Sequence, residues 1–333
     1  MTGAFDQDPL GAVLEFFSLL KGVGKFSNTP GRNAWETANV KRLGQASLQP
    51  GTLDQMIWPN QAVSKEQLLS ILAVGRDRIK VRKILDRVFL KLELEHLIEP
   101  FSQDDNLSTI YRVISPLGKE LLADGSYIEY IAGLPMVVKR WRHSVVKIYH
   151  PTDAGIGTGY LIETNMVATA KHVIKRLNEF EIAFEDGTVV HHKDVLFPKN
   201  MDDLDLAIVE LASHVQERRP FKLNIGRELL DEVVIFGYPP VPQADDAYLV
   251  VNRGEISADI KLCSQLQVLV VSCLLRGGNS GGPVVNRRGH VVGTISDNLF
   301  KKISEDEESI NEGLGFAAAI PSNWTQDLLD GKA

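Results

Sequence analysis

The most informative part of this chain is GNSGGP at residues 278–283, a serine within a glycine-rich turn. Two short motifs precede it, TAKHV at 169–173 and DLAIV at 205–209. Each of the three motifs lies where a turn meets an apolar run rich in β-branched residues. A serine hydroxyl is a weak nucleophile until a neighbouring base takes its proton, and that base needs an acid to hold its tautomer. We therefore predict that His172, Asp205 and Ser280 act together as base, orienting acid and nucleophile.

The order His, Asp, Ser along the chain is that of chymotrypsin-like proteases, whereas subtilisins and α/β-hydrolases order the same residue types differently. The glycines around Ser280 permit positive φ angles and a close approach of the backbone to a substrate carbonyl. The N–H groups of Gly278 and Ser280 would then point at the oxygen that becomes negative in the tetrahedral intermediate. The motifs therefore predict a serine endopeptidase that works through an acyl-enzyme.

Two other features compete with this assignment. Two aspartates at 202–203 lie close to Asp205, but Asp205 alone directly precedes the apolar run 206–211. Two histidines at 191–192 look like a metal pair, yet neighbours on a strand point to opposite faces. No cysteine or carboxylate spacing completes a zinc site around them. We expect no metal and no other cofactor.

Composition and charge narrow the function further. The 333 residues are 44% hydrophobic and 24% charged, and the net charge of −7 gives no global basic field for nucleic acid or anionic membrane. Residues 1–9 carry two acids and no base, which does not suit a secretory leader, and no apolar run approaches the ~20 residues of a membrane span. We expect a cytoplasmic protein.

The chain has only two cysteines, Cys263 and Cys273. Secreted relatives of trypsin usually depend on several disulfides, so two cysteines in a chain of this length indicate a reducing compartment. We expect both thiols to be free and buried, and a single Cys263–Cys273 disulfide is the alternative.

The first part of the chain predicts a helical extension over 1–50, with an amphipathic helix over 8–23. Residues 51–130 predict a helix over 65–73 that begins with a capping box, and a longer helix over 78–97. Two strands around a turn at 102–106 and a helix over 115–122 follow. This order of helix, helix, hairpin and helix resembles a winged-helix domain, and that resemblance covers about 51–128.

The pattern changes near Gly133-Leu134-Pro135, and we place the next domain at 136–333. Its short, β-branched runs end in Gly, Asn, Asp or Pro turns, as expected of antiparallel barrels. The predicted strands are 143–149, 158–163, 166–170, 181–184, 205–211, 232–237, 248–258, 265–273, 283–286 and 290–296. The fold class is therefore α+β overall, with a C-terminal all-β double barrel of two packed six-stranded barrels and a mostly helical N-terminal part.

Segment 143–324 resembles a trypsin-like serine peptidase of the HtrA/Deg kind. Five stretches carry the likeness: SVVKI at 144–148, GTGYLI at 157–162, IFGYP at 235–239, GEIS at 254–257 and GFAAAIP at 315–321. The chain differs from that family in two respects, since we expect no PDZ module after Pro321 and a winged-helix-like domain in place of a leader or anchor. Periplasmic quality control and PDZ-mediated activation are therefore not implied.

The same resemblance implies where substrate binds. Leu274, six residues before Ser280, takes the place of the residue that lines the floor of the primary pocket. Ala317 belongs near the other wall, so cleavage after an apolar side chain is expected. The stretch Ser296-Asp297-Asn298 takes the place where the family pairs substrate backbone as an added strand.

The helix over 78–97 carries a basic stripe. Residues 76–91 include seven basic and two acidic side chains. Four of the basic ones follow one another at helical spacing: Lys80, Lys83, Arg87 and Lys91. Such a helix suits a DNA groove, but the adjacent turn carries Asp104 and Asp105, and a DNA-binding surface usually continues onto that turn. We therefore expect a protein-interaction or oligomerisation role, with a regulatory protein partner on residues 1–135, and keep DNA binding as the second possibility.

These expectations leave two alternatives to a cytoplasmic peptidase with a regulatory module. One is a DNA-bound transcriptional regulator with proteolytic activity, and the other is a pseudoprotease scaffold. The pseudoprotease is the weakest, because His172, Asp205 and Ser280 are all present.

The sequence also bears on activation. Digestive relatives carry an Asp directly before the nucleophile, where it pairs with an amino terminus freed by cleavage. This chain has Asn279 there, and the stretch 136–142 lacks the Ile-Val-Gly-Gly start that such a terminus needs. We expect no zymogen cleavage.

Overall fold

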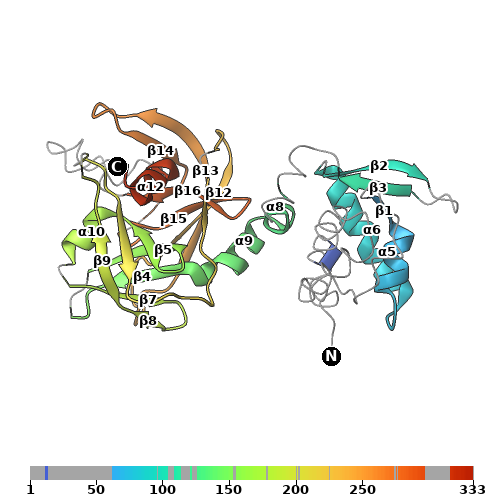
Figure 1. Cartoon of the computed structure of the whole chain (residues 1–333), viewed down its shortest axis with the longest axis horizontal. Helices are drawn as coiled ribbons and strands as arrows, with labels where there is room; N and C mark the ends of the chain where they lie inside the picture. Colours follow the sequence, from blue (N-terminus) through green and yellow to red (C-terminus); the bar gives the residue numbers. More distant parts are fainter. Residues whose placement is uncertain are drawn as a thin grey trace. The chain divides into compact units, whose positions relative to one another are not determined.

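The computed structural model describes residues 12–13, 62–95, 97–103, 109–113, 121, 126–152, 155–177, 179–199, 201, 203–224, 226–273, 275, 277–296 and 316–332. The chain divides into two compact units, Met1–Ala132 and Gly133–Ala333, and each is described by itself (Figure 1).

Two helices begin the described part of the N-terminal unit. The Ser64 hydroxyl accepts a hydrogen bond from the Gln67 N–H, and the Gln67 side chain accepts one from the Ser64 N–H, so the predicted capping box starts α5 (Lys65–Leu72). Asp77 caps α6 (Arg78–Leu94) through bonds from two backbone N–H groups. The two predicted helices are thus confirmed, and α6 ends earlier than expected.

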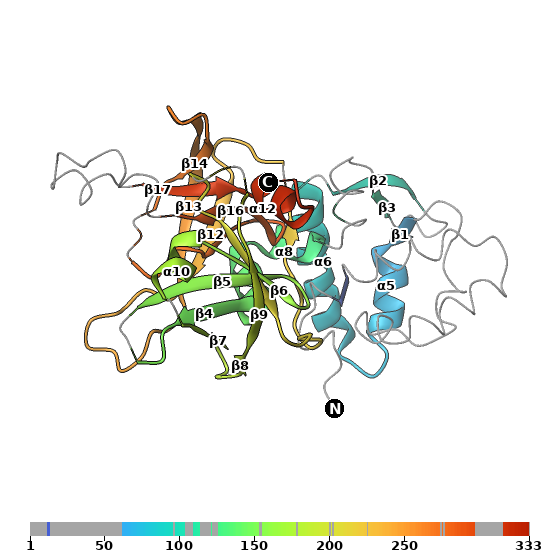
Figure 2. The same ribbon diagram turned by 60° about the vertical axis from the view of Figure 1, so that its left-hand side comes forward.

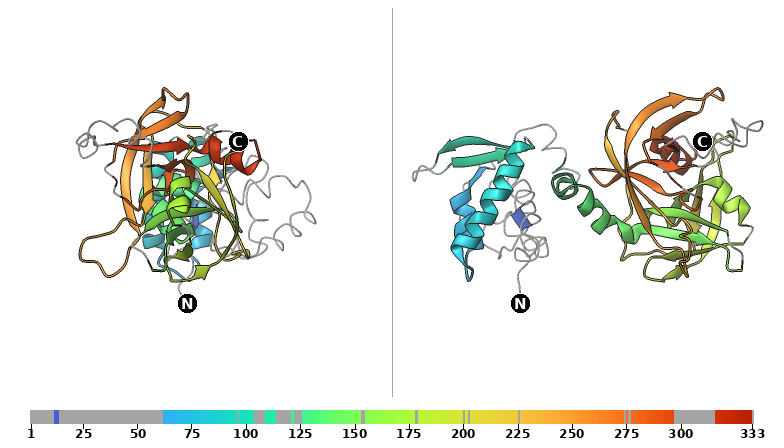
Figure 3. Two further views of the ribbon diagram at one scale, coloured as in Figure 1. Left: turned by 90° about the vertical axis from the view of Figure 1, so that its left-hand side faces the viewer. Right: turned by 180° about the vertical axis from the view of Figure 1, so that it is seen from behind.

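Three antiparallel strands accompany these helices, in the order β1-β3-β2, and the short helix α8 (Tyr127–Ala132) follows them (Figure 3). The strands are β1 (Ala62–Ser64), β2 (Ile98–Gln103) and β3 (Thr109–Val113). One apolar core joins α5, α6, the strands, and Ala12 and Val13 near the start of the chain. Most of the expected helix over 8–23, residues 104–106 of the expected turn and most of the helix over 115–122 lie outside the described residues.

The C-terminal unit contains two β-sheets of seven strands each, so the predicted double barrel is confirmed (Figure 2). The first sheet has the order β8-β7-β4-β5-β6-β10-β9. Its strands are β4 (Val145–Tyr149), β5 (Ile156–Glu163), β6 (Met166–Thr169), β7 (Glu181–Phe184), β8 (Val189–Val190), β9 (His192–Leu196) and β10 (Ala207–Leu211).

The second sheet has the order β11-β16-β15-β12-β13-β14-β17, and an additional pairing of β16 with β17 closes six of its strands into a barrel. Its strands are β11 (Lys222–Leu223), β12 (Glu232–Gly237), β13 (Val250–Lys261), β14 (Gln267–Val271), β15 (Pro283–Asn286), β16 (His290–Ile295) and β17 (Ala317–Pro321). The seventh strand, β11, is a two-residue addition parallel to β16, which the predicted count of six did not include. Helix α12 (Ser322–Leu329) contacts β10 of the first sheet and β11, β16 and β17 of the second.

The C-terminal unit begins with a helix that the sequence analysis did not predict. Helix α9 (Leu134–Trp141) buries Val137 and Trp141, and the Trp141 ring stacks on Phe221 with a centroid distance of 4.7 Å. Its apolar positions are spaced for a helix, and burial of two large side chains fixes it to the barrels.

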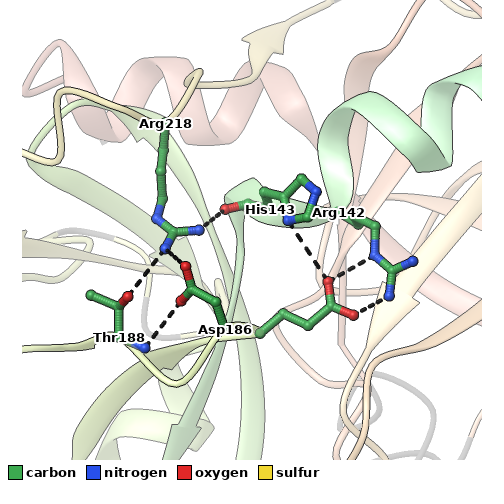
Figure 4. A network of polar contacts seen from close by, with 6 residues as sticks. Arg142, His143, Asp186, Thr188 and Arg218 are labelled. Atoms are coloured by element: carbon green, nitrogen blue, oxygen red, sulfur yellow. Dashed lines mark hydrogen bonds and ion pairs between the residues drawn. The ribbon is translucent and has the colours of Figure 1, made fainter.

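Ion pairs hold the turn η2 (Arg142–Ser144) that follows α9 (Figure 4). The Arg142 guanidinium pairs with Glu185, and its Nε lies 2.7 Å from a carboxylate oxygen. One residue on, Asp186 accepts a bond of 2.5 Å from Arg218, which also donates to the His143 carbonyl at 2.8 Å. The end of α9 is therefore tied to the turn that links β7 and β8.

Neither cysteine forms a disulfide, and only Cys273 is buried. Cys263 is exposed because it lies in the turn between β13 and β14, so the expectation of two buried thiols was wrong for this residue. Among the described residues, no helix combines the length and the apolar character that crossing a membrane requires.

Candidate active site

Strand pairing brings His172 and Asp205 together. In the antiparallel ladder between β6 and β10, Thr169 lies opposite Ala207. The chain leaves β6 at Thr169 into the short helix α10 (Lys171–Arg176), and Asp205 lies just before β10. The sequence therefore places the imidazole and the carboxylate at the same end of two adjacent strands.

Asp205 holds His172 through both of its carboxylate oxygens. The Nδ1 atom of His172 lies 2.6 Å from Oδ2 of Asp205, and the His172 backbone N–H donates to Oδ1 at 2.8 Å. An ionised carboxylate only accepts hydrogen bonds, so Nδ1 carries the proton and Nε2 is left as the basic nitrogen. This is the tautomer that a general base next to a serine requires.

A third donor reaches the same carboxylate. The Ser296 hydroxyl, fully buried, donates to Oδ2 of Asp205 at 2.5 Å. Burial raises the pKa of Asp205, but the hydrogen bonds from His172 and Ser296 and the charge of His172 outweigh it and hold the pKa below its ordinary value. Asp205 therefore stays ionised.

Ser280 lies in a turn whose shape depends on glycine. Gly278 and Gly281 have φ angles of +93° and +85°, which side chains rarely adopt. A Cβ atom on Gly281 would stand 2.1 Å from the Thr158 carbonyl oxygen and 2.9 Å from the Ala170 nitrogen. The turn that carries Ser280 is thus packed against the turn that carries His172.

Thr158, in β5 of the first barrel, fixes this turn. Its hydroxyl donates to the Gly278 carbonyl at 2.6 Å and accepts from the Tyr238 N–H at 2.9 Å, and its own N–H donates to the Ser280 carbonyl at 2.9 Å. The carbonyl of Asn279 accepts from the Gly282 N–H at 2.9 Å. All three carbonyls of the turn are therefore engaged.

The N–H groups of Gly278 and Ser280, in the same turn, differ from these carbonyls in their hydrogen bonding. Within the described part of the chain, no hydrogen bond has the N–H of Gly278 or of Ser280 as its donor. Backbone donors held in place without a partner suit a developing negative oxygen, because they need no reorganisation when the charge forms.

Of the remaining predicted site residues, the structure describes Ala317 and Ser296. Ala317 is buried in β17 opposite Val271, and the N–H of Ser296 donates to the Ala318 carbonyl at 3.1 Å. Leu274, Asp297 and Asn298 lie outside the described residues.

Sequence reasoning missed the roles of two side chains, Thr158 and Ser296. Thr158 was noted only as part of a strand, and a hydroxyl with glycine on both sides (GTG at 157–159) is the signal that could have marked it. Ser296 was expected to pair with substrate backbone, which stays a prediction, and its hydroxyl in addition contacts Asp205.

One of the two adjacent histidines at 191–192 makes an aromatic contact. His192 stacks on Phe180 with a centroid distance of 4.2 Å. Where the structure is described, no group of three or more His, Cys, Asp or Glu side chains is arranged to hold a metal ion.

Comparison with known proteins agrees with this geometry. Residues 157–293, which include His172, Asp205 and Ser280, match the model of the trypsin-like peptidase domain. Residues 157–293 of the C-terminal unit are thus similar to trypsin-like peptidase domains, and the curated relatives of this chain include HtrA and DegP-like proteins.

One such relative is the serine protease Do-like HtrA of Bacillus subtilis (strain 168), 30% identical over 193 residues that make up 54% of this chain and 39% of the relative. Another is the probable periplasmic serine endoprotease DegP-like of Chlamydia trachomatis, 27% identical over 81% of this chain and 50% of the relative. The chain thus spans half or less of the length of these two relatives. Among solved structures, the serine endoprotease from Yersinia pestis superposes with a TM-score of 0.47 at 22% identity, over 60% of this chain and 65% of that one.

Proposed function

We propose that this protein is a serine endopeptidase in which Ser280 is the nucleophile, His172 the general base and Asp205 the orienting acid. The observation that carries the proposal is the contact of His172 with Asp205 at one strand end, with the turn of Ser280 packed against it. A plain glycine-rich turn would need neither the buried carboxylate nor the positioned imidazole.

The chemistry follows from the proton positions. Asp205 holds the proton of His172 on Nδ1, so Nε2 takes the proton of the Ser280 hydroxyl while the serine oxygen attacks the substrate carbonyl. The N–H groups of Gly278 and Ser280 receive the carbonyl oxygen as it becomes negative. His172 then returns the proton to the leaving amine, and the acyl-enzyme forms.

Water completes the cycle by the same route. Nε2 of His172 takes a proton from water, the resulting hydroxide attacks the acyl carbon, and Ser280 leaves with that proton. Asp205 remains a carboxylate throughout, in agreement with its lowered pKa.

We propose cleavage after apolar residues, because the resemblance puts Leu274 on the floor of the primary pocket and Ala317 on its wall. An apolar floor offers no partner to a lysine or arginine, whose burial without a counter-charge is costly. We further propose that the enzyme works in a reducing compartment such as the cytoplasm, which its two free thiols support. In this proposal the N-terminal unit binds a regulatory protein.

A fluorophosphonate probe tests the proposed activity. We expect the full chain to be labelled on Ser280 and a quenched peptide with Leu or Val before the scissile bond to be cleaved. Ser280→Ala should lose both signals with an unchanged circular dichroism spectrum. The matched control is Ser264→Ala, which removes a serine from an exposed turn and should leave both signals intact. Labelling or cleavage that survives Ser280→Ala would refute the mechanism.

A further inference from the structure

Helix α6 presents an outer face that the core of its own unit does not use. The inner face of α6 buries Val81, Leu85, Val88, Phe89 and Leu92. Opposite them lie Ile79, Leu90 and Leu94, which are 68%, 55% and 70% exposed. At about 100° per residue these three positions fall within about 60° of arc, so they form one apolar strip.

Positive charge accompanies the strip. By the same helical geometry Lys83 falls within it, and Arg87 and Lys80 follow along one edge. All three cations are exposed, and none makes an ion pair with a described residue. We call Ile79, Lys80, Lys83, Arg87, Leu90 and Leu94 the outer face of α6.

Other charges near this helix already have partners. Arg78 and Arg82, nearer the side of α5, pair with Glu66, and Lys65 pairs with Asp86. Among the described residues, partners neutralise the charges on one side of α6 and not those of the outer face.

The chemistry of the face identifies what it suits. Nucleic acid would engage the cations through phosphates, but both ends of the face are aliphatic, and base edges are read mainly by polar side chains. A segment with acidic and aliphatic side chains on one face suits both the cations and the aliphatic side chains of the outer face. Its aliphatic contacts would exclude water around the charge pairs.

We propose that the outer face of α6 docks an acidic, amphipathic helix of a separate protein. The inference deepens the regulatory role given above to the N-terminal unit, and rests on that part of the proposed function. It assigns the partner's chemistry: aliphatic side chains against Ile79, Leu90 and Leu94, and carboxylates against Lys80, Lys83 and Arg87.

The test measures binding and not proteolysis. The protein is the full chain with Ser280→Ala, and the probe is a fluorescent helical peptide of about two heptads with Leu at the inward positions and Glu elsewhere. A matched peptide carries Lys in place of Glu. We expect the Glu peptide to bind in an anisotropy titration, to weaken as salt rises from about 50 to about 300 mM, and the Lys peptide not to bind.

Two double variants locate the site. Lys83→Glu with Arg87→Glu, and Leu90→Ser with Leu94→Ser, should each weaken binding about tenfold or more, without change in helix content. The control Lys199→Glu with Lys261→Glu changes net charge equally at two exposed positions outside the N-terminal unit and should leave binding unchanged.

Three results would overturn the proposal: equal binding of the Glu and Lys peptides, no effect of the α6 variants, or binding of duplex DNA that depends on Lys83 and Arg87. Self-association that disappears with Leu90→Ser and Leu94→Ser would also overturn it, since the occupant would then be a second copy. Probe labelling of Ser280 in the unsubstituted chain is scored separately, so failure of the protease assignment cannot be mistaken for failure of docking.

Discussion

The side-chain hydroxyl of Thr158 donates a hydrogen bond of 2.6 Å to the carbonyl oxygen of Gly278. Thr158 belongs to β5 of the first barrel, and Gly278 belongs to the turn that carries Ser280 in the second. The same hydroxyl accepts from the N–H of Tyr238, which follows β12. One buried hydroxyl of the first barrel thus fixes the peptide that joins Gly278 to Asn279, which lies between the two proposed oxyanion donors, the N–H groups of Gly278 and Ser280.

Replacing Thr158 by Val should remove this link. The valine fills the same space but leaves the Gly278 carbonyl and the Tyr238 N–H without their partner, which costs about 1–3 kcal/mol in the free energy of unfolding. Turnover should fall about tenfold or more, because the turn that carries both proposed oxyanion donors loses a fixed point between them. Urea unfolding and peptide hydrolysis measure the two effects. Thr158→Ser keeps the hydroxyl and should retain most of the activity; equal losses in both variants would count against this role.

Replacing Asp205 by Asn should reduce turnover by a factor on the order of 10⁴. The amide keeps the shape of the side chain but can donate to Nδ1 of His172, which then presents the protonated Nε2 to Ser280. Steady-state hydrolysis of the quenched peptide measures the loss. Asp194→Asn, on the exposed strand β9, is the control and should be silent. A loss of less than about tenfold would show that Asp205 does not orient the base.

Replacing Ser296 by Ala should make stability less dependent on acid pH. The folded pKa of Asp205 lies below its ordinary value, so ionised Asp205 contributes stability that is complete above about pH 4 and is lost as the pH falls through the folded pKa. Without the Ser296 donor that pKa rises towards its ordinary value, so stability at neutral pH falls by about 1–3 kcal/mol and less of it is left to lose on acidification.

Urea unfolding at intervals from about pH 3 to about pH 7 measures this shift. Ser264→Ala should follow the unsubstituted protein across that range. Parallel curves for Ser296→Ala and the unsubstituted chain, offset by a constant amount, would contradict a role for Ser296 in setting the pKa of Asp205.

Replacing Leu274 by Asp should move the cleavage preference towards Lys and Arg. A carboxylate on the pocket floor pairs with a basic side chain, whereas the present leucine favours Val, Leu, Ala or Met before the scissile bond. A peptide library read by mass spectrometry compares the two proteins. Cleavage by the unsubstituted chain mainly after Lys or Arg would refute the assignment of Leu274 to the pocket.

The full-length chain should be labelled by the probe without prior cleavage. Asn279 cannot make the ion pair that a freed amino terminus would require, and the segment before β4 is a helix whose Trp141 is buried against Phe221. Intact mass followed together with labelling of Ser280 tests this expectation. Labelling that appears only after a cut near residues 130–145 would show that the enzyme needs activation by proteolysis.

The barrel strands and the proximity of His172 to Asp205 could be predicted from local patterns. Each long strand is a β-branched run closed by a turn. His172 follows β6 and Asp205 precedes β10, and these two strands pair in the sheet. The role of Ser296 could not be predicted in the same way, because its partner Asp205 is distant in sequence and is brought near only by packing of the barrels. The two-residue strands β8 and β11 carry too few side chains to show a period.

Helix α9 escaped prediction for a different reason. Residues 136–142 mix basic and apolar side chains, which looks like an exposed connection until the rings of Trp141 and Phe221 are seen to stack. Lys139 and Arg140 lie in its last turn, where cations favour the helix end, so their charge stabilises the helix.

The burial of Trp141 decides where a fragment of this protein can begin. A peptidase fragment that started at β4 would keep every strand and the three proposed catalytic residues, yet it would lack the indole that covers Phe221. The exposed cavity would cost about 3–5 kcal/mol, a large part of the stability of an ordinary domain. It would also leave Glu185 without Arg142. The shortest self-sufficient peptidase therefore begins before α9, at Gly133, and every future dissection of the two units has to cut on the N-terminal side of that helix.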